Sequence, residues 1–232
     1  MTRTRVKICG ITCVDDALLA VRAGADAIGM VFQPGARRFV GDAVARDILQ
    51  ALPAFVTPVG LFVDVPVEIV REKARLLGLR HIQLHGSESP EVVAQLSPLV
   101  VLKAVRVVNG ELVDTLGLWK DAITRLKLTN LRGIILETAS TTHAGGTGIA
   151  NDWPTVADAQ QRDAFTGLPP LIAAGGLRPE NVADVIRLIR PFAVDVSSGV
   201  EASPGRKSPE HIQAFMRAVA EAETQMHPNE HR

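Results

Sequence analysis

A thiol and a carboxyl group each stand at the end of a short apolar segment. Cys9 ends the segment Arg5–Cys9 and precedes Gly10, and Glu137 ends the segment Gly133–Glu137. A thiolate can act as a base or a nucleophile when its surroundings lower its pKa, and a carboxyl group can act as a general acid or base. The alternatives are a small buried apolar residue for Cys9 and a structural ion pair for Glu137. The residues alone leave both interpretations open for each side chain.

Two further segments end in glycine or serine, which suits them to bind a phosphate group. Gly175 and Gly176 follow the segment Pro170–Ala174, and Ser198-Gly199 follow the segment Ala193–Ser197. Glycines let backbone N–H groups approach an anion, and the loops after the seventh and eighth strands of a barrel often bind phosphate. The pattern therefore predicts a phosphorylated small-molecule substrate, bound by Gly175, Gly176, Ser197, Ser198 and Gly199.

Arginine and histidine provide other candidate ligands. Arg37 and Arg38 lie in the loop after the second apolar segment, where a guanidinium could bind an anionic substrate group or simply face solvent. His81, Gln83 and His85 share one face of the fourth segment because side chains alternate along a strand. Two histidines without an evident third ligand do not make a convincing metal site, so no metal is predicted.

The loop that follows Glu137 is rich in glycine. It reads Thr141-Thr142-His143-Ala144-Gly145-Gly146-Thr147-Gly148. It is not a phosphate-binding P-loop, because no Lys-Ser or Lys-Thr pair follows the last glycine. We interpret this loop as a lid over the site.

Eight short apolar segments alternate with amphipathic stretches, and these elements must position the candidate residues. Alternation of strand and helix predicts an α/β fold with a parallel sheet. The sheet could be a closed (β/α)8 barrel or an open doubly wound sheet, and the length and the strand count favour a single TIM barrel. The predicted strands are Arg5–Cys9, Ala27–Phe32, Val59–Val63, His81–His85, Val100–Val105, Gly133–Glu137, Pro170–Ala174 and Ala193–Ser197.

Three predicted helix starts carry capping residues. Ser89-Pro90-Glu91 and Ser208-Pro209-Glu210 each combine a capping hydroxyl, a proline suited to the first turn and an acid that favours the helix dipole. Thr12-Cys13-Val14-Asp15 resembles a capping box in which aspartate replaces the usual glutamate.

The composition excludes several classes of protein. Hydrophobic residues make up 47% of the 232 residues and charged residues 22%, so the chain is not disordered. The 25 basic residues balance the 25 acidic residues, so neither a nucleic acid nor an anionic membrane surface is an expected partner. The longest stretch without charge, residues 48–63, is too short and too interrupted by proline to span a membrane.

The same evidence bounds the domain organisation and the compartment. Two cysteines, Cys9 and Cys13, cannot form a disulfide framework, and the N-terminus lacks the apolar core of a signal peptide. We therefore expect a cytoplasmic protein with one barrel domain over residues 1–222 and a polar tail over residues 223–232.

Closure of the barrel makes a specific prediction about two charges. A closed sheet places the first strand beside the eighth, with Lys7 and Cys9 on its inner face and with Asp195 and Ser197 on the inner face of the eighth. An unpaired charge in this position would be very costly. Lys7 and Asp195 should therefore form a buried ion pair across the seam between these strands.

Four motifs resemble the phosphoribosylanthranilate isomerases of tryptophan biosynthesis, and the resemblance extends from about Arg5 to Val219. The motifs are Lys7-Ile8-Cys9-Gly10-Ile11-Thr12, Gln83-Leu84-His85-Gly86, Gly145-Gly146-Thr147-Gly148 with Asp152-Trp153 after it, and Asp195-Val196-Ser197-Ser198-Gly199-Val200-Glu201. The resemblance implies a TIM barrel that catalyses an Amadori rearrangement. It implies neither a metal nor an organic cofactor, and it leaves the assembly as a monomer or a homodimer.

The resemblance also implies roles for individual residues. Cys9 matches the general base that removes the C2′ proton, and Glu137 matches the acid that protonates the furanose oxygen, where the family usually has aspartate. Arg38, rather than Arg37, matches the arginine that engages the anthranilate moiety. Gly176, Ser197, Ser198 and Gly199 match the phosphate site, and Gln83 and His85 belong to a substrate-binding motif.

Two other functions compete with this interpretation. Another phosphate-binding barrel enzyme, such as an epimerase or a synthase, would lack the motif around Cys9 and would often need paired carboxylates or metal ligands. A non-catalytic barrel that binds phosphosugars would account for Glu137 as a sign of lost chemistry, but retention of Cys9 argues against it.

Overall fold

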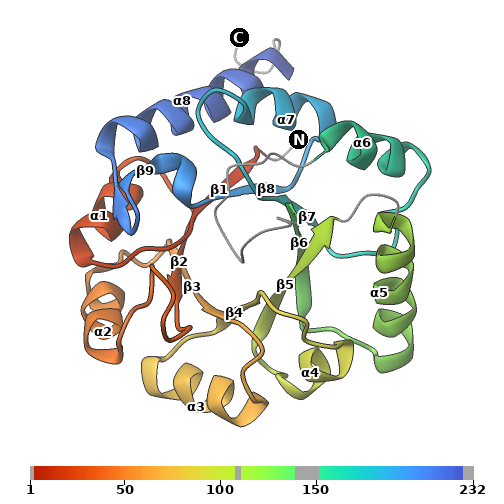
Figure 1. The fold of residues 1–232 in the computed structure, drawn as a ribbon, viewed down its shortest axis with the longest axis horizontal. Coiled ribbons are helices and arrows are strands. Elements are labelled where there is room, and N and C mark those ends of the chain that lie inside the picture. The colour runs from red at the N-terminus through yellow and green to blue at the C-terminus, as the bar shows by residue number, and fades with distance from the viewer. Residues whose placement is uncertain (1–2, 108–110, 139–151, 227–232) are drawn as a thin grey trace.

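Eight parallel strands form a closed barrel at the centre of the molecule (Figure 1). The structure is a computed structural model that describes residues 3–107, 111–138 and 152–226. Neighbouring strands pair in chain order, and β1 pairs with β8 to close the sheet, so the open doubly wound alternative is excluded. The strands are β1 (Arg5–Ile8), β2 (Ala27–Val31), β3 (Thr57–Phe62), β4 (His81–Leu84), β5 (Val100–Val107), β6 (Leu131–Thr138), β7 (Leu171–Ala173) and β8 (Ala193–Val196).

Helices surround the barrel and bury their apolar faces against it (Figure 1). In α7, for example, the buried residues recur at steps of one to three residues along a single face, as an amphipathic helix requires. These helices are α1 (Val14–Arg22), α2 (Asp42–Ala51), α3 (Val67–Leu77), α4 (Pro90–Gln95), α5 (Leu112–Leu126), α6 (Trp153–Gln161), α7 (Val182–Ile189) and α8 (Pro209–Met226).

The barrel interior is filled by small and aliphatic side chains. Ala104, Ile135 and Ile172 belong to one inner cluster, and Cys9 packs with Val31 and Leu61 in another. Because alternate residues of a strand face the same side, these clusters identify which residues point inward. The predicted inward orientation of Cys9 is therefore confirmed.

All eight predicted strands are present, and each differs from its predicted bounds by at most a few residues at either end. A turn that the sequence did not predict follows β8: the 3-10 helix η1 (Ser198–Val200) leads into an antiparallel hairpin. The strands of this hairpin are β9 (Glu201–Ser203) and β10 (Arg206–Lys207).

One of the three predicted helix caps is present and two are wrong. Ser89 is the N-cap residue of α4, but its side chain makes no capping bond. The hydroxyl of Ser208 accepts a hydrogen bond from the backbone N–H of His211 at 3.2 Å, as the start of α8 requires. At the start of α1, Cys13 is the N-cap residue and makes no capping bond with its side chain. Thr12 donates its hydroxyl proton to the carbonyl of Gly205 at 2.7 Å, because the hairpin places this acceptor within reach.

The C-terminal end of the barrel domain lies inside a helix. Helix α8 continues to Met226, so residues 223–226 of the predicted tail belong to it. The carboxylate of Glu223 accepts hydrogen bonds from both the backbone N–H, at 2.9 Å, and the hydroxyl of Thr4. The rest of the predicted tail and the predicted lid at residues 141–148 lie outside the described residues.

The predicted ion pair between Lys7 and Asp195 is confirmed. These residues are register partners on β1 and β8, and the distance from Lys7 Nζ to Asp195 Oδ2 is 2.8 Å. Each side chain is only 6% exposed. Burial by itself lowers the pKa of Lys7, but the carboxylate of Asp195 and the thiol of Cys9 raise it, and the net shift is upward. Lys7 is therefore held as a cation inside the barrel.

Loss of either partner of this pair is expected to destabilise the fold strongly. Asp195→Asn or Lys7→Met should each lower the free energy of unfolding by about 3–5 kcal/mol, because each leaves the other charge buried and unpaired. Urea denaturation followed by circular dichroism measures the loss. The double variant Lys7→Met/Asp195→Leu should lose less than the sum of the single losses. Single variants that each lose less than about 1 kcal/mol would show that the pair does not hold the seam.

Candidate active site

Cys9 lies just beyond the end of β1, inside the mouth of the barrel. Its backbone N–H donates to the carbonyl of Val196 at 2.8 Å, and its side chain is 7% exposed. A Cβ atom placed on Gly29 would lie 2.7 Å from the sulfur of Cys9 and 3.1 Å from Lys7 Nζ. Position 29 is therefore glycine because the thiol and the ammonium group occupy the space above it.

Burial and the nearby charges shift the pKa of the Cys9 thiol in opposite directions. Burial raises the pKa of the thiol, the nearby Lys7 and Lys207 lower it, and the net shift is upward. A base that works near neutral pH should be a thiol whose pKa lies below its ordinary value, so we expected the thiolate of Cys9 to form easily. That expectation is wrong, because desolvation of the thiolate outweighs the two ammonium groups. Both lysines nevertheless favour the thiolate, so they support a role for Cys9 as a base.

Glu137 lies near the end of β6 and is joined to two of the predicted residues. Its Oε2 atom is 2.8 Å from His85 Nε2, and His85 Nδ1 is 3.0 Å from Gln83 Nε2. Because an amide nitrogen donates, Nδ1 accepts its hydrogen bond and Nε2 carries the proton that faces Glu137. Two side chains of the β4 segment therefore orient the carboxyl group of Glu137. Gln83, which is buried, contacts His85, which is half-buried, and His85 contacts Glu137.

Arg38 reaches the site through an ion pair. Its Nε and Nη2 atoms donate to the two carboxylate oxygens of Glu201 at 2.7 and 2.8 Å. A Cβ atom on Gly10, whose φ is +74°, would lie 2.3 Å from Arg38 Cδ, so Arg38 passes directly over the residue that follows Cys9. Arg37 is exposed in the same loop.

Lys207 completes this cluster from the hairpin. Its Nζ atom is 3.0 Å from Glu201 Oε1 and donates to the carbonyl of Ser197 at 3.0 Å. Burial raises the pKa of Glu201, but Arg38 and Lys207 lower it, and the net shift is downward. Glu201 is therefore a carboxylate that ties the Arg38 loop to the segment after β8.

Glu201 and Lys207 were not among the predicted site residues. Glu201 ends the motif that begins at Asp195, so its neighbourhood could have indicated a role. Lys207 carries no such signal, because only the unpredicted hairpin brings it back beneath Ser197.

A small cavity lies between the loops after β7 and β8. Its volume is about 170 Å³, and it is lined by Gly176, Leu177, Arg178, Ser198 and Gly199. A Cβ atom on Gly199 would lie 1.9 Å from the carbonyl oxygen of Leu177, so only glycine lets the two loops approach. Among the described residues, no hydrogen bond engages the backbone N–H groups of Gly176, Ser198 and Gly199. These donors beside a cavity fit the predicted phosphate site.

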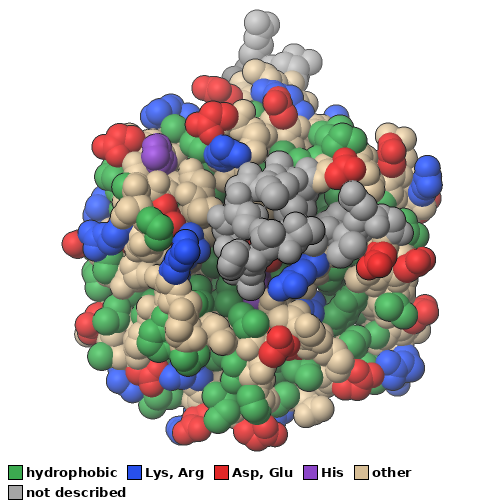
Figure 2. Space-filling view, viewed as in Figure 1, with side chains coloured by type: hydrophobic (Ala, Val, Ile, Leu, Met, Phe, Trp, Pro, Cys, Tyr) green, Lys and Arg blue, Asp and Glu red, His purple; other side chains and the backbone are tan. Residues whose placement is uncertain are grey.

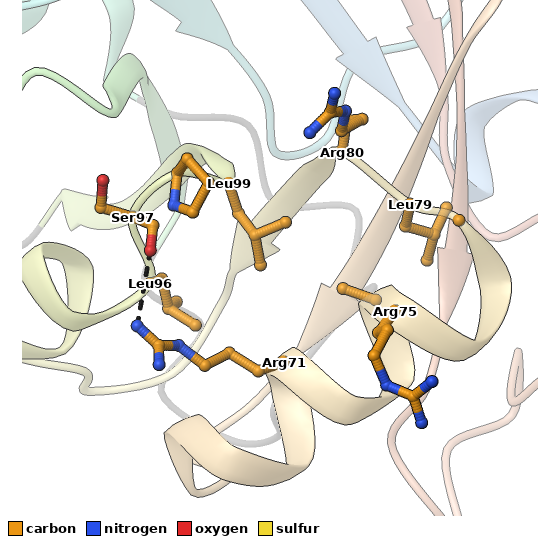
Figure 3. A pocket seen from close by; sticks show the side chains of 10 residues that line it. Arg71, Arg75, Leu79, Arg80, Leu96, Ser97 and Leu99 are labelled. Atoms are coloured by element: carbon orange, nitrogen blue, oxygen red, sulfur yellow. Dashed lines mark hydrogen bonds between the residues drawn. The ribbon is translucent and has the colours of Figure 1, made fainter.

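A larger cavity lies away from the candidate residues. Its volume is about 500 Å³, and it lies between α3 and α4, where β4 and β5 begin (Figure 3). Figure 3 shows Arg71 pointing toward Ser97, with Arg75 and Arg80 pointing to different sides. Cys9 and Glu137 stand where strands end, so this cavity is not part of the candidate active site.

On the face drawn in Figure 2, acidic and basic side chains are interspersed around the rim. No three His, Cys, Asp or Glu side chains come together as metal ligands in the part of the chain that the structure describes. Within the same part, no helix has the length and apolar character needed to cross a membrane.

Comparison with known proteins places the barrel in one family. The family described as N-(5'phosphoribosyl)anthranilate (PRA) isomerase matches residues 6–218. A protein of Nitrosospira multiformis, named N-(5'-phosphoribosyl)anthranilate isomerase, is 44% identical over 222 residues, which are 95% of this chain and 98% of that protein.

Solved structures agree with this match. One is described as mutually generated monomers of the dimeric phosphoribosylanthranilate isomerase of Thermotoga maritima. Its sequence is 37% identical and its TM-score is 0.74, and the match covers 94% of this chain and 99% of that one. Another is described as a phosphoribosylanthranilate isomerase in complex with reduced 1-(o-carboxyphenylamino)-1-deoxyribulose 5-phosphate; its identity is 38% and its TM-score 0.75, with the same coverage. The resemblance seen in the sequence motifs is thus confirmed along nearly the whole barrel, and the chain belongs to the N-(5'-phosphoribosyl)anthranilate isomerase family.

Proposed function

We propose that the chain converts N-(5'-phosphoribosyl)anthranilate to 1-(2-carboxyphenylamino)-1-deoxyribulose 5-phosphate in tryptophan biosynthesis. One observation carries the proposal at the level of the site. A buried thiol flanked by two lysines and a carboxyl group held by His85 stand in one barrel mouth. Beside them is a cavity whose lining includes Gly176, Ser198 and Gly199. This arrangement supplies a base, an acid and a phosphate anchor to one small molecule.

The chemistry divides between Cys9 and Glu137. Glu137 gives its proton to the furanose oxygen while the bond between that oxygen and C1′ breaks, which leaves an iminium ion at C1′ and nitrogen. The thiolate of Cys9 then removes the proton from C2′, and the electron pair of that bond neutralises the iminium to give an enolamine. Transfer of the enol proton from oxygen to C1′ gives the ketose. Transfer of the proton from the thiol of Cys9 to the carboxylate of Glu137 through solvent restores both groups for the next turnover. Each proton then has a stated donor and acceptor, so the proposal needs neither a metal nor an organic cofactor.

The other site residues bind and orient the substrate. Gly175, Gly176, Ser197, Ser198 and Gly199 are proposed to hold the phosphate group, and Arg38 is proposed to engage the anthranilate moiety. The bidentate pair with Glu201 supports this role for Arg38, because it fixes the guanidinium above Gly10. Gln83 and His85 are proposed to complete the substrate site, with His85 in contact with Glu137.

We propose that the enzyme is cytoplasmic and binds neither nucleic acid nor a membrane. It consists of one catalytic domain, which α8 extends to Met226. The monomer and the homodimer were both expected from the resemblance. The dimeric Thermotoga relative and the 98% exposed side chain of Phe55, in the loop before β3, support the homodimer. Light scattering coupled to size-exclusion chromatography measures the mass, and a mass of one chain would exclude the dimer.

A direct assay tests the proposed function. Purified protein should abolish the fluorescence of N-(5'-phosphoribosyl)anthranilate, and Gly199→Ala should raise KM because a methyl group at this position collides with the Leu177 carbonyl. Circular dichroism checks that the variant is folded. Absence of turnover by the folded wild-type protein would exclude the isomerase and favour a barrel that only binds phosphosugars.

The rate is expected to rise with pH above neutrality. Burial raises the pKa of Cys9, and only the thiolate is a base, so more of the enzyme becomes active as the pH increases. Lys207→Gln should move this rise to higher pH, because it removes a positive charge that lowers the pKa of the thiol. Measurement of kcat/KM against pH tests both statements. A shift of the rise to lower pH in this variant would contradict them.

A further inference from the structure

Another buried ion pair lies on the outer side of the barrel wall. Lys103 Nζ is 2.9 Å from Glu88 Oε2, and the two side chains are 4% and 3% exposed. Lys103 lies on β5 between Leu102 and Ala104, which both pack in the inner cluster. Because side chains alternate along a strand, that of Lys103 points outward, toward the helices. The pair therefore does not face the substrate, and none of the proposed chemical steps uses it.

Both charges of this pair hold the backbone of Gly86, in the loop after β4. Lys103 Nζ donates to the carbonyl of Gly86 at 2.7 Å. The N–H of Gly86 donates to the carboxylate of Glu88, at 3.1 Å to Oε1 and 2.9 Å to Oε2. Burial raises the pKa of Glu88, but Lys103 and backbone N–H groups lower it, and the net shift is downward. Glu88 is therefore a carboxylate that accepts all of these bonds.

The segment after β3, which runs beside β4 in the barrel (Figure 1), supports the same loop. The N–H of Asp64 donates to Glu88 Oε1 at 2.9 Å, and Asp64 Oδ1 accepts a hydrogen bond from the N–H of Ser87 at 2.7 Å. A Cβ atom on Gly86 would lie 2.4 Å from Asp64 Oδ1, so only glycine leaves room for this carboxylate. The loops after β3 and β4 are thus tied together through Glu88 and Asp64.

These contacts fix the direction of the His85 side chain. The N–H of His85 donates to the carbonyl of Phe62 at 2.9 Å, and the next N–H along the chain, that of Gly86, is held by Glu88. The peptide groups on both sides of His85 are anchored, which sets its φ and ψ and with them the direction of its Cβ atom. At the far end of this side chain, His85 Nε2 meets Glu137 Oε2 at 2.8 Å.

We infer that Lys103 and Glu88 are positioning residues for the proposed acid, Glu137, and act on it through His85. The inference rests on the proposed function, in which the place of the Glu137 carboxyl group decides the rate. Two apolar side chains could fill the same space with little loss of stability. They could not hold both the N–H and the carbonyl of Gly86, so the buried charges serve to fix one conformation of this loop.

A cycle of variants measured by kcat tests this route. Glu88→Gln keeps the size of the side chain but replaces one accepting oxygen with a donor, so Lys103 or the backbone N–H groups lose their acceptor. It should lower kcat by between about tenfold and a hundredfold, as expected for a displaced acid. His85→Ala should also lower kcat. The double variant should lie within about twofold of His85→Ala, because without the imidazole the loop has nothing left to position.

A matched control separates positioning from general loss of stability. Val93 is fully buried in α4, the helix that follows the same loop. Val93→Ala removes methyl groups from the core and should destabilise the protein while kcat stays at the wild-type value. Urea denaturation ranks the stability of Val93→Ala and Glu88→Gln, so that kcat is compared at a similar loss.

A milder pair of variants carries the test if Glu88→Gln does not fold. Asp64 is exposed, and its φ is +50°, a left-handed conformation that glycine and asparagine also adopt. Asp64→Gly removes the acceptor of the Ser87 N–H and should lower kcat, though less than Glu88→Gln does. Asp64→Asn keeps an acceptor oxygen and should restore most of this loss.

The ring of His85 provides a readout that does not depend on turnover. In protein labelled with 15N-histidine, the proton on Nε2 should give a resonance shifted downfield by its bond to Glu137, assigned by its absence from His85→Ala. Glu88→Gln should shift or broaden this resonance, and Val93→Ala should leave it unchanged.

The outcomes separate the inference from the function on which it rests. A displaced His85 resonance in Glu88→Gln, with no further loss of kcat in the double variant, supports the inference. An unchanged resonance, or a further fall in kcat when Glu88→Gln is added to His85→Ala, would overturn it. If the folded wild-type protein shows no turnover while its His85 resonance still responds to Glu88→Gln, the proposed function fails and the link between Glu88 and His85 stands.

Discussion

Cys9→Ser is expected to lower kcat by about two to four orders of magnitude, the range typical of lost general acid–base catalysis. The hydroxyl of serine is a much weaker acid than a thiol, so almost no alkoxide is available to remove the C2′ proton. Serine is close to cysteine in shape, so the contact above Gly29 and the ion pair between Lys7 and Asp195 should persist. The loss should therefore appear in the chemical step and leave binding intact.

Two measurements isolate this effect. Turnover of N-(5'-phosphoribosyl)anthranilate gives kcat, and calorimetry with the reduced product analogue gives Kd, which should stay near the wild-type value. Cys13→Ser is the matched control, because Cys13 lies half-buried at the start of α1 and is not directed into the barrel. Near-normal turnover by Cys9→Ser would remove Cys9 from the mechanism.

Local signals in the sequence were sufficient to predict the barrel and the residues that face its interior. Apolar residues recur with different periods in strands and in helices, so the two can be told apart. Because side chains alternate along a strand, the sequence also shows which of them share a face. Closure of the sheet adds one long-range fact, that β1 and β8 are neighbours. From these two rules alone, Lys7 and Asp195 were placed in contact, 188 residues apart in the chain.

The contacts that the sequence did not reveal depend on side chains meeting across irregular segments. Arg38 and Glu201 are 163 residues apart, and neither lies on a strand of the barrel. No periodicity in the loop or the hairpin predicts that they meet. The Thr12 cap failed for the same reason, since the competing acceptor, Gly205, belongs to that hairpin.

The direction of the pKa shift of Cys9 could also not be predicted from the sequence. The influence of Lys7 can be anticipated from the motif, but that of Lys207 cannot. The desolvation that opposes both lysines depends on how completely the thiol is buried. Only the packing against Val31 and Leu61 shows that burial is nearly complete. For Glu137, the shared face of Gln83 and His85 was predictable, but their contact with the carboxyl group of another strand was not.

Glu137→Gln is expected to abolish turnover, with a loss of about two to four orders of magnitude in kcat. The amide keeps the size of the side chain, and its oxygen can still accept the proton on His85 Nε2, so the contact at 2.8 Å should be retained. An amide cannot give up a proton to the furanose oxygen, so ring opening should stop. Binding of the reduced product analogue should change little, which separates loss of the acid from loss of the site.

Glu137→Asp tests whether the surroundings have adapted to glutamate, since the resemblance in the sequence motifs implies aspartate at this position. The shorter side chain withdraws the carboxyl group by roughly 1.5 Å, about one C–C bond. That withdrawal breaks the contact with His85, and a misplacement of this size can cost on the order of 10²-fold in rate. We therefore expect Glu137→Asp to retain measurable turnover, well above Glu137→Gln and well below wild type. Full activity in Glu137→Gln would show that another group is the acid, and full activity in Glu137→Asp would show that the contact with His85 does not position it.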